Sequence, residues 1–309
     1  MANLRNALQT LWMHPGFFLM RSIARFDYVR TATVRAQCVM RGSIDGYLRA
    51  LSGRTSEYFP GADPRSLAVA VERDGLAFGL KLPAATVADL LEFARVNPCW
   101  IDRNRKLGFA PDRIEEARQR LGRRFLLAQY MNVRQRSPLV AKLAEDPVLL
   151  EIAARYLGTK PRLVGVNLWW SYPEVADAAA RDFAAQKFHF DLDDFKFIKF
   201  FFYLTDVDAT SGPHVVVRGT HRRKRHASFR EQFAVRRYSD EEVIAAYGAD
   251  SVVTITGPAG TGFVEDTMCI HKGLPPASRP RLALQIQYAL NDFGNQNDDV
   301  SESALEMLV

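Results

Sequence analysis

Cysteine is scarce in this sequence, and long apolar runs are missing from it. Only Cys38, Cys99 and Cys269 occur among 309 residues, far apart and without a CxxC pair. This disfavours both a disulfide scaffold and a thiolate zinc site. No run approaches the roughly 18–20 apolar residues needed to cross a bilayer, so we expect no transmembrane segment.

The amino-terminal residues also lack the continuous apolar stretch of a signal peptide, because Gln9, His14 and Pro15 interrupt it. Together with the missing disulfide pattern, this predicts a cytoplasmic protein. The segment is expected to form a helix packed on the rest of the molecule, with an amphipathic helix on a membrane surface as the alternative.

The shortage of apolar residues that marks disordered chains is not found, since 48% of the residues are hydrophobic and 25% are charged. We therefore expect one folded domain over residues 1–309. The formal net charge is +6, which permits an anionic partner without identifying one. Much of this charge lies in a basic run at 218–237.

Residues 1–160 are predicted to form a mostly helical scaffold or lid. Apolar residues at three- and four-residue spacing, typical of helices, occur in 85–96, 112–131 and 138–158. The last of these segments is interrupted at Pro147 and is expected to end at Gly158. A lone strand is predicted at 75–83.

After Pro161 the sequence changes to short segments rich in β-branched and aromatic residues, separated by Gly, Pro, Asp and Ser. These predicted strands are 162–172, 195–207, 214–219, 251–257, 261–266 and 281–290. Many short strands with tight turns indicate an antiparallel sandwich or barrel. We expect this core to span 161–290, followed by a tail at 291–309 that is loosely ordered over 291–303.

The segment HFDLDD places potential metal ligands at short spacing. In a strand, residues i and i+2 face the same way, so His189 and Asp191 would project together. They make two thirds of a two-histidine, one-carboxylate metal site, which on iron leaves open positions for a cosubstrate and oxygen. His271, at the end of a predicted strand, is the candidate third ligand.

Two further carboxylates compete with Asp191. Asp193 shares its face but would lie roughly 13 Å from His189 on a straight strand, and Asp194 points away. We expect both to cap the following turn or to accept hydrogen bonds near the mouth of the core.

An arginine begins the strand RLALQIQY. Alternation puts one set of residues on the same face: Arg281, Ala283, Gln285 and Gln287. An arginine at a strand start inside a barrel mouth can bind a ligand carboxylate through two hydrogen bonds. Arg279 is the alternative, but Pro280 places it in the preceding turn.

Four pieces of the carboxyl-terminal half resemble the phytanoyl-CoA dioxygenase (PhyH-like) family of Fe(II)/2-oxoglutarate-dependent oxygenases. They are HFDLDDFKFIKFFFYLTDVD, SGPHVVVRGTHRRK, GPAGTGFVEDTMCIHKG and RPRLALQIQYAL. The resemblance covers about 160–290 and extends more faintly to 73–94. It implies a mainly β protein with a helical N-terminal half, in which α-helices flank a double-stranded β-helix (jelly-roll, cupin-like) core.

The resemblance also implies the roles of individual residues. His189, Asp191 and His271 would bind Fe(II), and Arg281 would hold the distal carboxylate of the cosubstrate 2-oxoglutarate, with O2 as the oxidant. The chain departs from the family in reading RGTH where a PGSH-like turn is common, which affects a turn and not the metal. Because Asp191 is present where related halogenases have a small residue, halogenation is disfavoured.

Several other polar residues are weaker candidates. Lys199 interrupts an apolar strand and would need a carboxylate partner, so it could help to hold 2-oxoglutarate or substrate. Asn167 is a second candidate contact of the cosubstrate. The other four histidines, His14, His214, His221 and His226, are not expected to bind the metal. We expect a structural role for His221 and solvent exposure for His14 and His226. Cys269 shares the parity of His271 but is expected to be a small core residue.

The function predicted from these residues is hydroxylation of an unactivated C–H bond in a small-molecule or acyl-type substrate, with release of succinate and CO2. A cupin-like metal enzyme that does not use 2-oxoglutarate is the alternative, and it would not need Arg281. The basic run reads as a solvated loop, or as a contact for an anionic handle on the substrate at Arg222–Arg225. A basic module that binds nucleic acid or an anionic membrane would leave the metal ligands unexplained, and we expect no nucleic-acid partner because no recognised binding motif accompanies the charge.

Overall fold

A computed structural model of the chain describes residues 12, 14–174, 186–222, 224, 237–294 and 299–309. Its helices are α2 (Pro15–Ile23), α3 (Asp27–Arg41), α4 (Asp45–Ser52), α5 (Pro64–Asp74), α6 (Ala84–Val96), α7 (Ile114–Leu121), α8 (Val133–Arg136), α9 (Pro138–Leu143), α10 (Pro147–Leu157) and α12 (Asp240–Tyr247). Its strands are β1 (Leu76–Lys81), β2 (Cys99–Ile101), β3 (Gly108–Phe109), β4 (Leu127–Tyr130), β5 (Arg162–Ser171), β6 (Phe197–Tyr203), β7 (His214–Val217), β8 (Val252–Ile255), β9 (Thr261–Glu265), β10 (His271–Gly273) and β11 (Arg281–Ala289).

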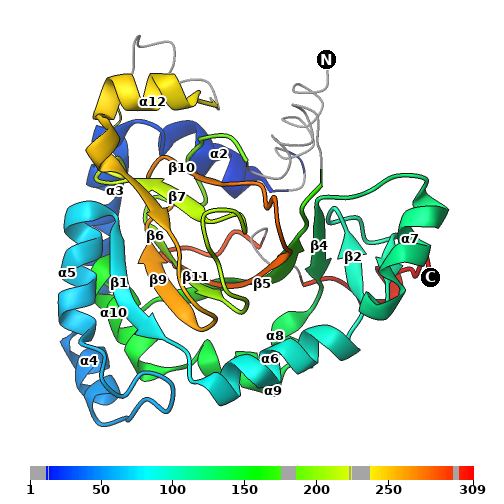
Figure 1. The fold of residues 1–309 in the computed structure, drawn as a ribbon. Helices are drawn as coiled ribbons and strands as arrows, with labels where there is room; N and C mark the ends of the chain where they lie inside the picture. Colours follow the sequence, from blue (N-terminus) through cyan, green and yellow to red (C-terminus); the bar gives the residue numbers. More distant parts are fainter. Residues whose placement is uncertain (1–11, 13, 175–185, 223, 225–236, 295–298) are drawn as a thin grey trace.

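The strands form two antiparallel sheets, as the predicted fold class requires. The larger sheet has the order β1-β9-β6-β11-β5-β4-β2-β3, and the smaller has the order β10-β7-β8. The side chains between the sheets are mostly aromatic and β-branched, with Phe201 and Phe263 of the larger sheet in one buried cluster with Val216 and Ile255 of the smaller. The jelly-roll core with flanking helices is thereby confirmed (Figure 1).

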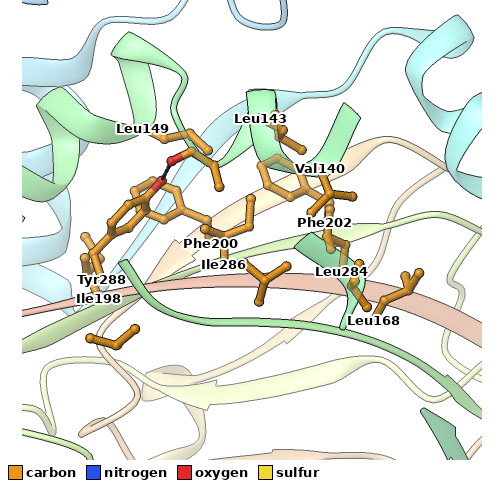
Figure 2. Close-up of a cluster of buried hydrophobic side chains, with 14 of the residues drawn as sticks. Val140, Leu143, Leu149, Leu168, Ile198, Phe200, Phe202, Leu284, Ile286 and Tyr288 are labelled. Atoms are coloured by element: carbon orange, nitrogen blue, oxygen red, sulfur yellow. Dashed lines mark hydrogen bonds between the residues drawn. The ribbon is translucent and has the colours of Figure 1, made fainter. Parts of the chain in front are cut away.

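The other face of the larger sheet is covered by helices. Alternation along β11 directs Leu284, Ile286 and Tyr288 into this second core, where helical leucines and valines meet them (Figure 2). The hydroxyl of Tyr288 donates a hydrogen bond of 2.6 Å to the backbone oxygen of Ala144. The opposite residues of β11 therefore face the space between the two sheets, as the sequence predicts.

Both ends of α10 follow from the sequence. Asp146 caps α10 by accepting a hydrogen bond from Val148 N, Pro147 occupies the first turn, and Gly158 ends the helix with φ 73°. The predicted interruption of 138–158 at Pro147 is confirmed, because α9 ends at Leu143 and α10 begins at Pro147.

The helix predicted over 112–131 is wrong in its second half. Gly122, with φ 65°, ends α7, and residues 127–130 form β4, which pairs with β2 and β5. The strand predicted at 75–83 is not alone either, since β1 pairs with β9 at the edge of the larger sheet. The first half of the chain therefore contributes β1–β4 to that sheet of 8 strands.

The carboxyl-terminal tail is better fixed than the sequence predicts. Outside 295–298, which the structure does not describe, Asn291 bonds Asp194, and Glu302 forms an ion pair of 2.5 Å with Arg136. Met307 pairs with Gly108 of β3, and Val309 is buried. Among the described residues, no helix has the length and apolar character needed to span a membrane.

Candidate metal centre

His189 and His271 are brought together by a backbone bridge. His189 N donates to His271 O at 2.9 Å, and His271 N donates to His189 O at 2.7 Å. Asp191 follows, with its N–H bonded to Thr267 O at 2.9 Å. Each of these three residues offers one ligand atom, and the three atoms lie within 4.8 Å of one another. The arrangement has the composition of a two-histidine, one-carboxylate metal site.

Both histidine rings are oriented by backbone carbonyls. The Nδ1 of His189 lies 2.8 Å from the oxygen of Lys187, and the Nδ1 of His271 lies 2.9 Å from the oxygen of Cys269. A proton on each Nδ1 leaves the Nε2 lone pairs free, and these atoms lie 3.9 and 3.8 Å from the Asp191 carboxylate. Burial, with the charge of His271, lowers the pKa of His189 to about 3, so this ring is neutral and suited to bind a metal.

The carboxylate of Asp191 is held by Lys199. The Nζ of this β6 lysine lies 2.8 Å from Oδ2 of Asp191 and 2.9 Å from Oδ2 of Asp193. Burial alone would raise the pKa of Asp191, but Lys199 and the two histidines hold it well below its ordinary value. Asp191 is therefore ionised, which metal ligation requires.

The position of Asp193 differs from the sequence prediction, which placed it too far away on a straight strand. In this segment His189 forms only an isolated bridge, residues 190–192 are irregular, residues 193–196 form a bend, and β6 begins at Phe197. The bend carries Asp193 to Lys199. Asp194 points away as expected and accepts hydrogen bonds from Asn291 and Phe195.

Arg281 lies at the start of β11 with its side chain buried. Its Nη1 donates to the oxygen of Gly212 and its Nη2 to Ser171 Oγ at 3.1 Å, while its Nε has no partner. It forms no ion pair with any described carboxylate. Arg279, the alternative, is half exposed and forms an ion pair of 3.0 Å with Asp208 in the preceding loop. The buried guanidinium of Arg281 can therefore donate a further hydrogen bond, because its Nε has no partner among the described residues.

Between Arg281 and the three candidate ligands lies a histidine–glutamate pair that the sequence reading did not identify. His214 Nε2 is 2.7 Å from Glu265 Oε2, and the His214 ring lies 5.3 Å from that of His271. Burial lowers the pKa of His214 to about 3 and raises that of Glu265 to about 8, so in both residues it favours the uncharged form. The alternation of Glu265 with Phe263 in TGFVED was the available signal.

Polar side chains of β5 and β11 complete this side of the core. Asn167 and Gln285 are direct partners across the two strands, and Gln287 Nε2 donates to Asp193 Oδ2 at 3.2 Å. Gln285 is 8% exposed and makes no side-chain hydrogen bond to the described residues. Its amide is therefore free to bind a molecule in the core.

Two of the three remaining bystander histidines, His221 and His14, lie among the described residues. His221 Nδ1 is 3.6 Å from Cys269 Sγ, and both residues are buried, in keeping with structural roles. His14 precedes α2 and is half-buried. His226 lies outside the described residues.

Only part of the basic run can be placed. Arg222 is exposed and lies 3.6 Å from Glu72, whereas Lys224 is buried with its Nζ 4.2 Å from the Phe190 ring. Residues 223 and 225–236 lie outside the described residues. The contact of an anionic substrate handle with Arg222–Arg225 therefore stays a prediction.

The order of the strands defines a jelly-roll fold, and the histidines and the aspartate between its two sheets are typical of metal-dependent enzymes. A family model described as phytanoyl-CoA dioxygenase (PhyH) matches residues 101–295, well over half of the chain. The chain belongs to this family and is a non-haem iron, 2-oxoglutarate-dependent dioxygenase. No curated protein sequence matches it significantly.

Solved structures show the same fold at low sequence identity. The epimerase SnoN, in complex with Fe3+, alpha ketoglutarate and nogalamycin RO, is 18% identical, with 73% of this chain and 82% of that chain covered and a TM-score of 0.51. EctD from S. alaskensis with bound Fe is 20% identical over 80% and 84%, with a TM-score of 0.46. HygX from Streptomyces hygroscopicus, with nickel and 2-oxoglutarate bound, is 16% identical over 74% and 87%, with a TM-score of 0.45. At these identities the likeness concerns the fold alone.

Proposed function

We propose that the protein hydroxylates an unactivated C–H bond of a small-molecule or acyl-type substrate, converting 2-oxoglutarate to succinate and CO2. In this proposal His189, Asp191 and His271 hold iron(II), and Arg281 binds the distal carboxylate of 2-oxoglutarate. The observation that carries it is the buried Arg281 guanidinium, which has no carboxylate partner among the described residues and whose Nε makes no hydrogen bond. A dicarboxylate cosubstrate would supply the missing charge.

The spacing between the candidate ligands and Arg281 fits a short dicarboxylate. A Cβ on Gly273 would lie 3.8 Å from Arg281 Nη2, and Gly273 follows His271 by two residues in β10. Two residues of strand span about 7 Å, comparable to the length of a five-carbon dicarboxylate. One end of such a molecule could reach the metal while the other meets Arg281, and Asn167 is kept as a proposed further contact.

Bound iron would supply the activation of oxygen. The protein's own part is orientation and exclusion of water: three ligands on one side leave the other coordination positions to cosubstrate and oxygen. The two Nδ1 hydrogen bonds fix the histidine rings, and in the His214–Glu265 pair burial favours the uncharged forms. The aromatic rings of Phe201 and Phe263 pack against the His214 ring, with centroids at 5.2 and 5.4 Å.

The test is the visible absorption band that appears when iron(II) and 2-oxoglutarate are both bound to such a site. We expect the band in the wild-type protein under anaerobic conditions, its loss in His189→Ala, and its retention in His14→Ala, a histidine outside the site. A full band in His189→Ala would contradict the assignment of this ligand.

Substrate identity would follow from a screen for substrate-dependent succinate release. The alternative function, a cupin-like metal enzyme without 2-oxoglutarate, makes a different prediction, because it has no use for a buried arginine. Unchanged turnover by Arg281→Ala on a substrate found in the screen would favour that alternative.

A further inference from the structure

Lys199 lies at the metal centre, yet it is neither a metal ligand nor a surface charge. Its side chain is 8% exposed, and its ammonium group lies between two carboxylates, at 2.8 Å from Asp191 and 2.9 Å from Asp193. A buried lysine is costly unless carboxylates surround it. The fold therefore provides a second carboxylate, Asp193, that no metal ligand set requires.

The contact is selective for one oxygen of the candidate ligand. Lys199 donates to Oδ2 of Asp191, which lies 3.8 Å from His271 Nε2, while Oδ1 lies 3.9 Å from His189 Nε2. An ammonium donor occupies one of the two lone pairs of the oxygen that it binds and draws negative charge toward its proton, which makes that oxygen the weaker ligand. The other oxygen remains the better ligand for a cation.

Asp193 is fixed on the far side of the lysine. Its Oδ2 accepts a hydrogen bond of 3.2 Å from Gln287 Nε2, so the chain of contacts runs from β11 through Asp193 and Lys199 to Asp191. With one positive and two negative charges, the three residues keep a single net negative charge facing the metal position. Without Asp193 the lysine would cancel the charge of the ligand.

We propose that Lys199 and Asp193 are positioning residues that restrict Asp191 to one metal bond. A carboxylate that bound through both oxygens would occupy a coordination position needed by cosubstrate or oxygen. Lys199 disfavours this by making Oδ2 the weaker ligand, and Asp193 offsets the charge that Lys199 brings. This inference rests on the proposed metal site.

The experiment counts the water molecules bound to Mn(II) in the protein by water-proton relaxation, and measures the Mn(II) dissociation constant. The decisive variant is Lys199→Met/Asp193→Asn, which has the same net charge as the wild type but lacks the donor. We expect its relaxivity to fall by about a third, because one of three open positions is lost, while the dissociation constant stays within a few-fold of the wild-type value.

The single variant Asp193→Asn separates charge from geometry. It keeps the Lys199 donor, so the relaxivity should not change, but the metal should bind about 10-fold more weakly or worse. Thermal melting checks that each variant is folded, and Asp193→Asn still tests the inference if the double variant does not fold.

Wild-type relaxivity in the folded double variant, or wild-type affinity in Asp193→Asn, would overturn the role of the pair. If the wild-type protein itself binds no Mn(II), the proposed metal site is wrong and the inference falls with it. Mn(II) binding with loss of hydration in the double variant, by contrast, supports the inference whatever substrate the enzyme uses.

Discussion

The buried side chains of Lys199 and Arg281 both carry a positive charge, but only that of Lys199 is neutralised by carboxylates of the folded chain. Lys199 has two carboxylates within 3 Å, whereas Arg281 has only a backbone oxygen and the hydroxyl of Ser171. Burial lowers the pKa of Arg281, but a guanidinium remains charged at any ordinary pH. The uncompensated charge of Arg281 is therefore the feature that supports its proposed role in binding an anion.

The first prediction concerns that charge. Arg281→Ala should weaken 2-oxoglutarate binding at least about tenfold, since it removes charge-assisted hydrogen bonds. Arg281→Lys should recover part of the affinity, and Arg279→Ala, in the neighbouring loop, should bind as the wild type does. Titration of the iron-dependent absorption band with 2-oxoglutarate measures all four affinities; equal affinity in Arg281→Ala would exclude the proposed clamp.

A second prediction at this scale concerns Asp194, which is fully buried. Burial raises its pKa from 3.8 to about 6, although hydrogen bonds from Asn291 and Phe195 act in the opposite sense. Because the folded state holds the proton more tightly than the unfolded state, Asp194 is most favourable to stability below pH 3.8 and loses this contribution as the pH rises through about 6.

Relative to Asp194→Asn, the free energy of unfolding of the wild type should therefore fall by about 3 kcal/mol between pH 3.5 and pH 7. Urea unfolding of the metal-free protein across this range measures the difference. Parallel pH profiles for the two proteins would show that Asp194 does not titrate in this way.

At the scale of elements, the junction of α5 and β1 supports the metal centre from behind. Gly75 ends α5 with φ 74° and sits against the side chains of Cys269 and His221, whose Nδ1 would lie 2.6 Å from an added Cβ. Cys269 O in turn accepts the Nδ1 hydrogen bond of His271. This helix end can therefore approach the segment before β10 only without a side chain.

Gly75→Ala should therefore lower the free energy of unfolding for two reasons: the positive φ of this residue strains an alanine, and the added Cβ collides with Cys269 and His221. Gly122 is the matched control, because it ends α7 with φ 65° and has nothing within 4 Å of an added Cβ. We expect a loss of about 1 kcal/mol for Gly122→Ala from strain, and about 2 kcal/mol beyond that for Gly75→Ala from overpacking. Equal losses in denaturant unfolding would show that the packing at Gly75 is unimportant.

At the scale of the whole molecule, the candidate site joins parts of the chain that are remote in sequence. His271 begins β10 of the smaller sheet, Lys199 belongs to β6 of the larger sheet, and His189 precedes β6 and bridges to β10. A metal bound to His189, Asp191 and His271 would link the smaller sheet to the segment that leads into β6, where Lys199 of the larger sheet holds Asp191.

Metal binding should consequently stabilise the fold as a whole. At a free Mn(II) concentration of 100 times its dissociation constant, the free energy of unfolding should rise by about 2.7 kcal/mol. His271→Ala should show no such rise, whereas His14→Ala should show all of it. Thermal melting with and without the metal gives the comparison, and stabilisation that persists in His271→Ala would indicate binding elsewhere.

An antiparallel β core and the pairing of His189 with Asp191 could be predicted, because they depend on short β-rich segments and on local spacing. The jelly roll is implied by the family resemblance, which also supports His271 as the distant third ligand. β4 could not be predicted, since its apolar residues also fit a helical period and only pairing with β5 decides between them. The contact between Asp193 and Lys199 depends on a bend of the backbone that a strand-based distance does not include. The His214–Glu265 pair depends on which strands become neighbours, which sequence periodicity does not reveal.

The pairing of β1 with β9 has a practical consequence for making this protein. The stretch that matches the family model, 101–295, leaves out β1, although β1 pairs with β9 along its whole length from Leu76 to Lys81, with one irregularity between Phe78 and Leu80. A recombinant fragment cut at residue 101 would expose the hydrogen-bonding groups of β9 to other chains, and an open strand of this kind promotes aggregation. Soluble expression therefore demands a starting point well before Leu76.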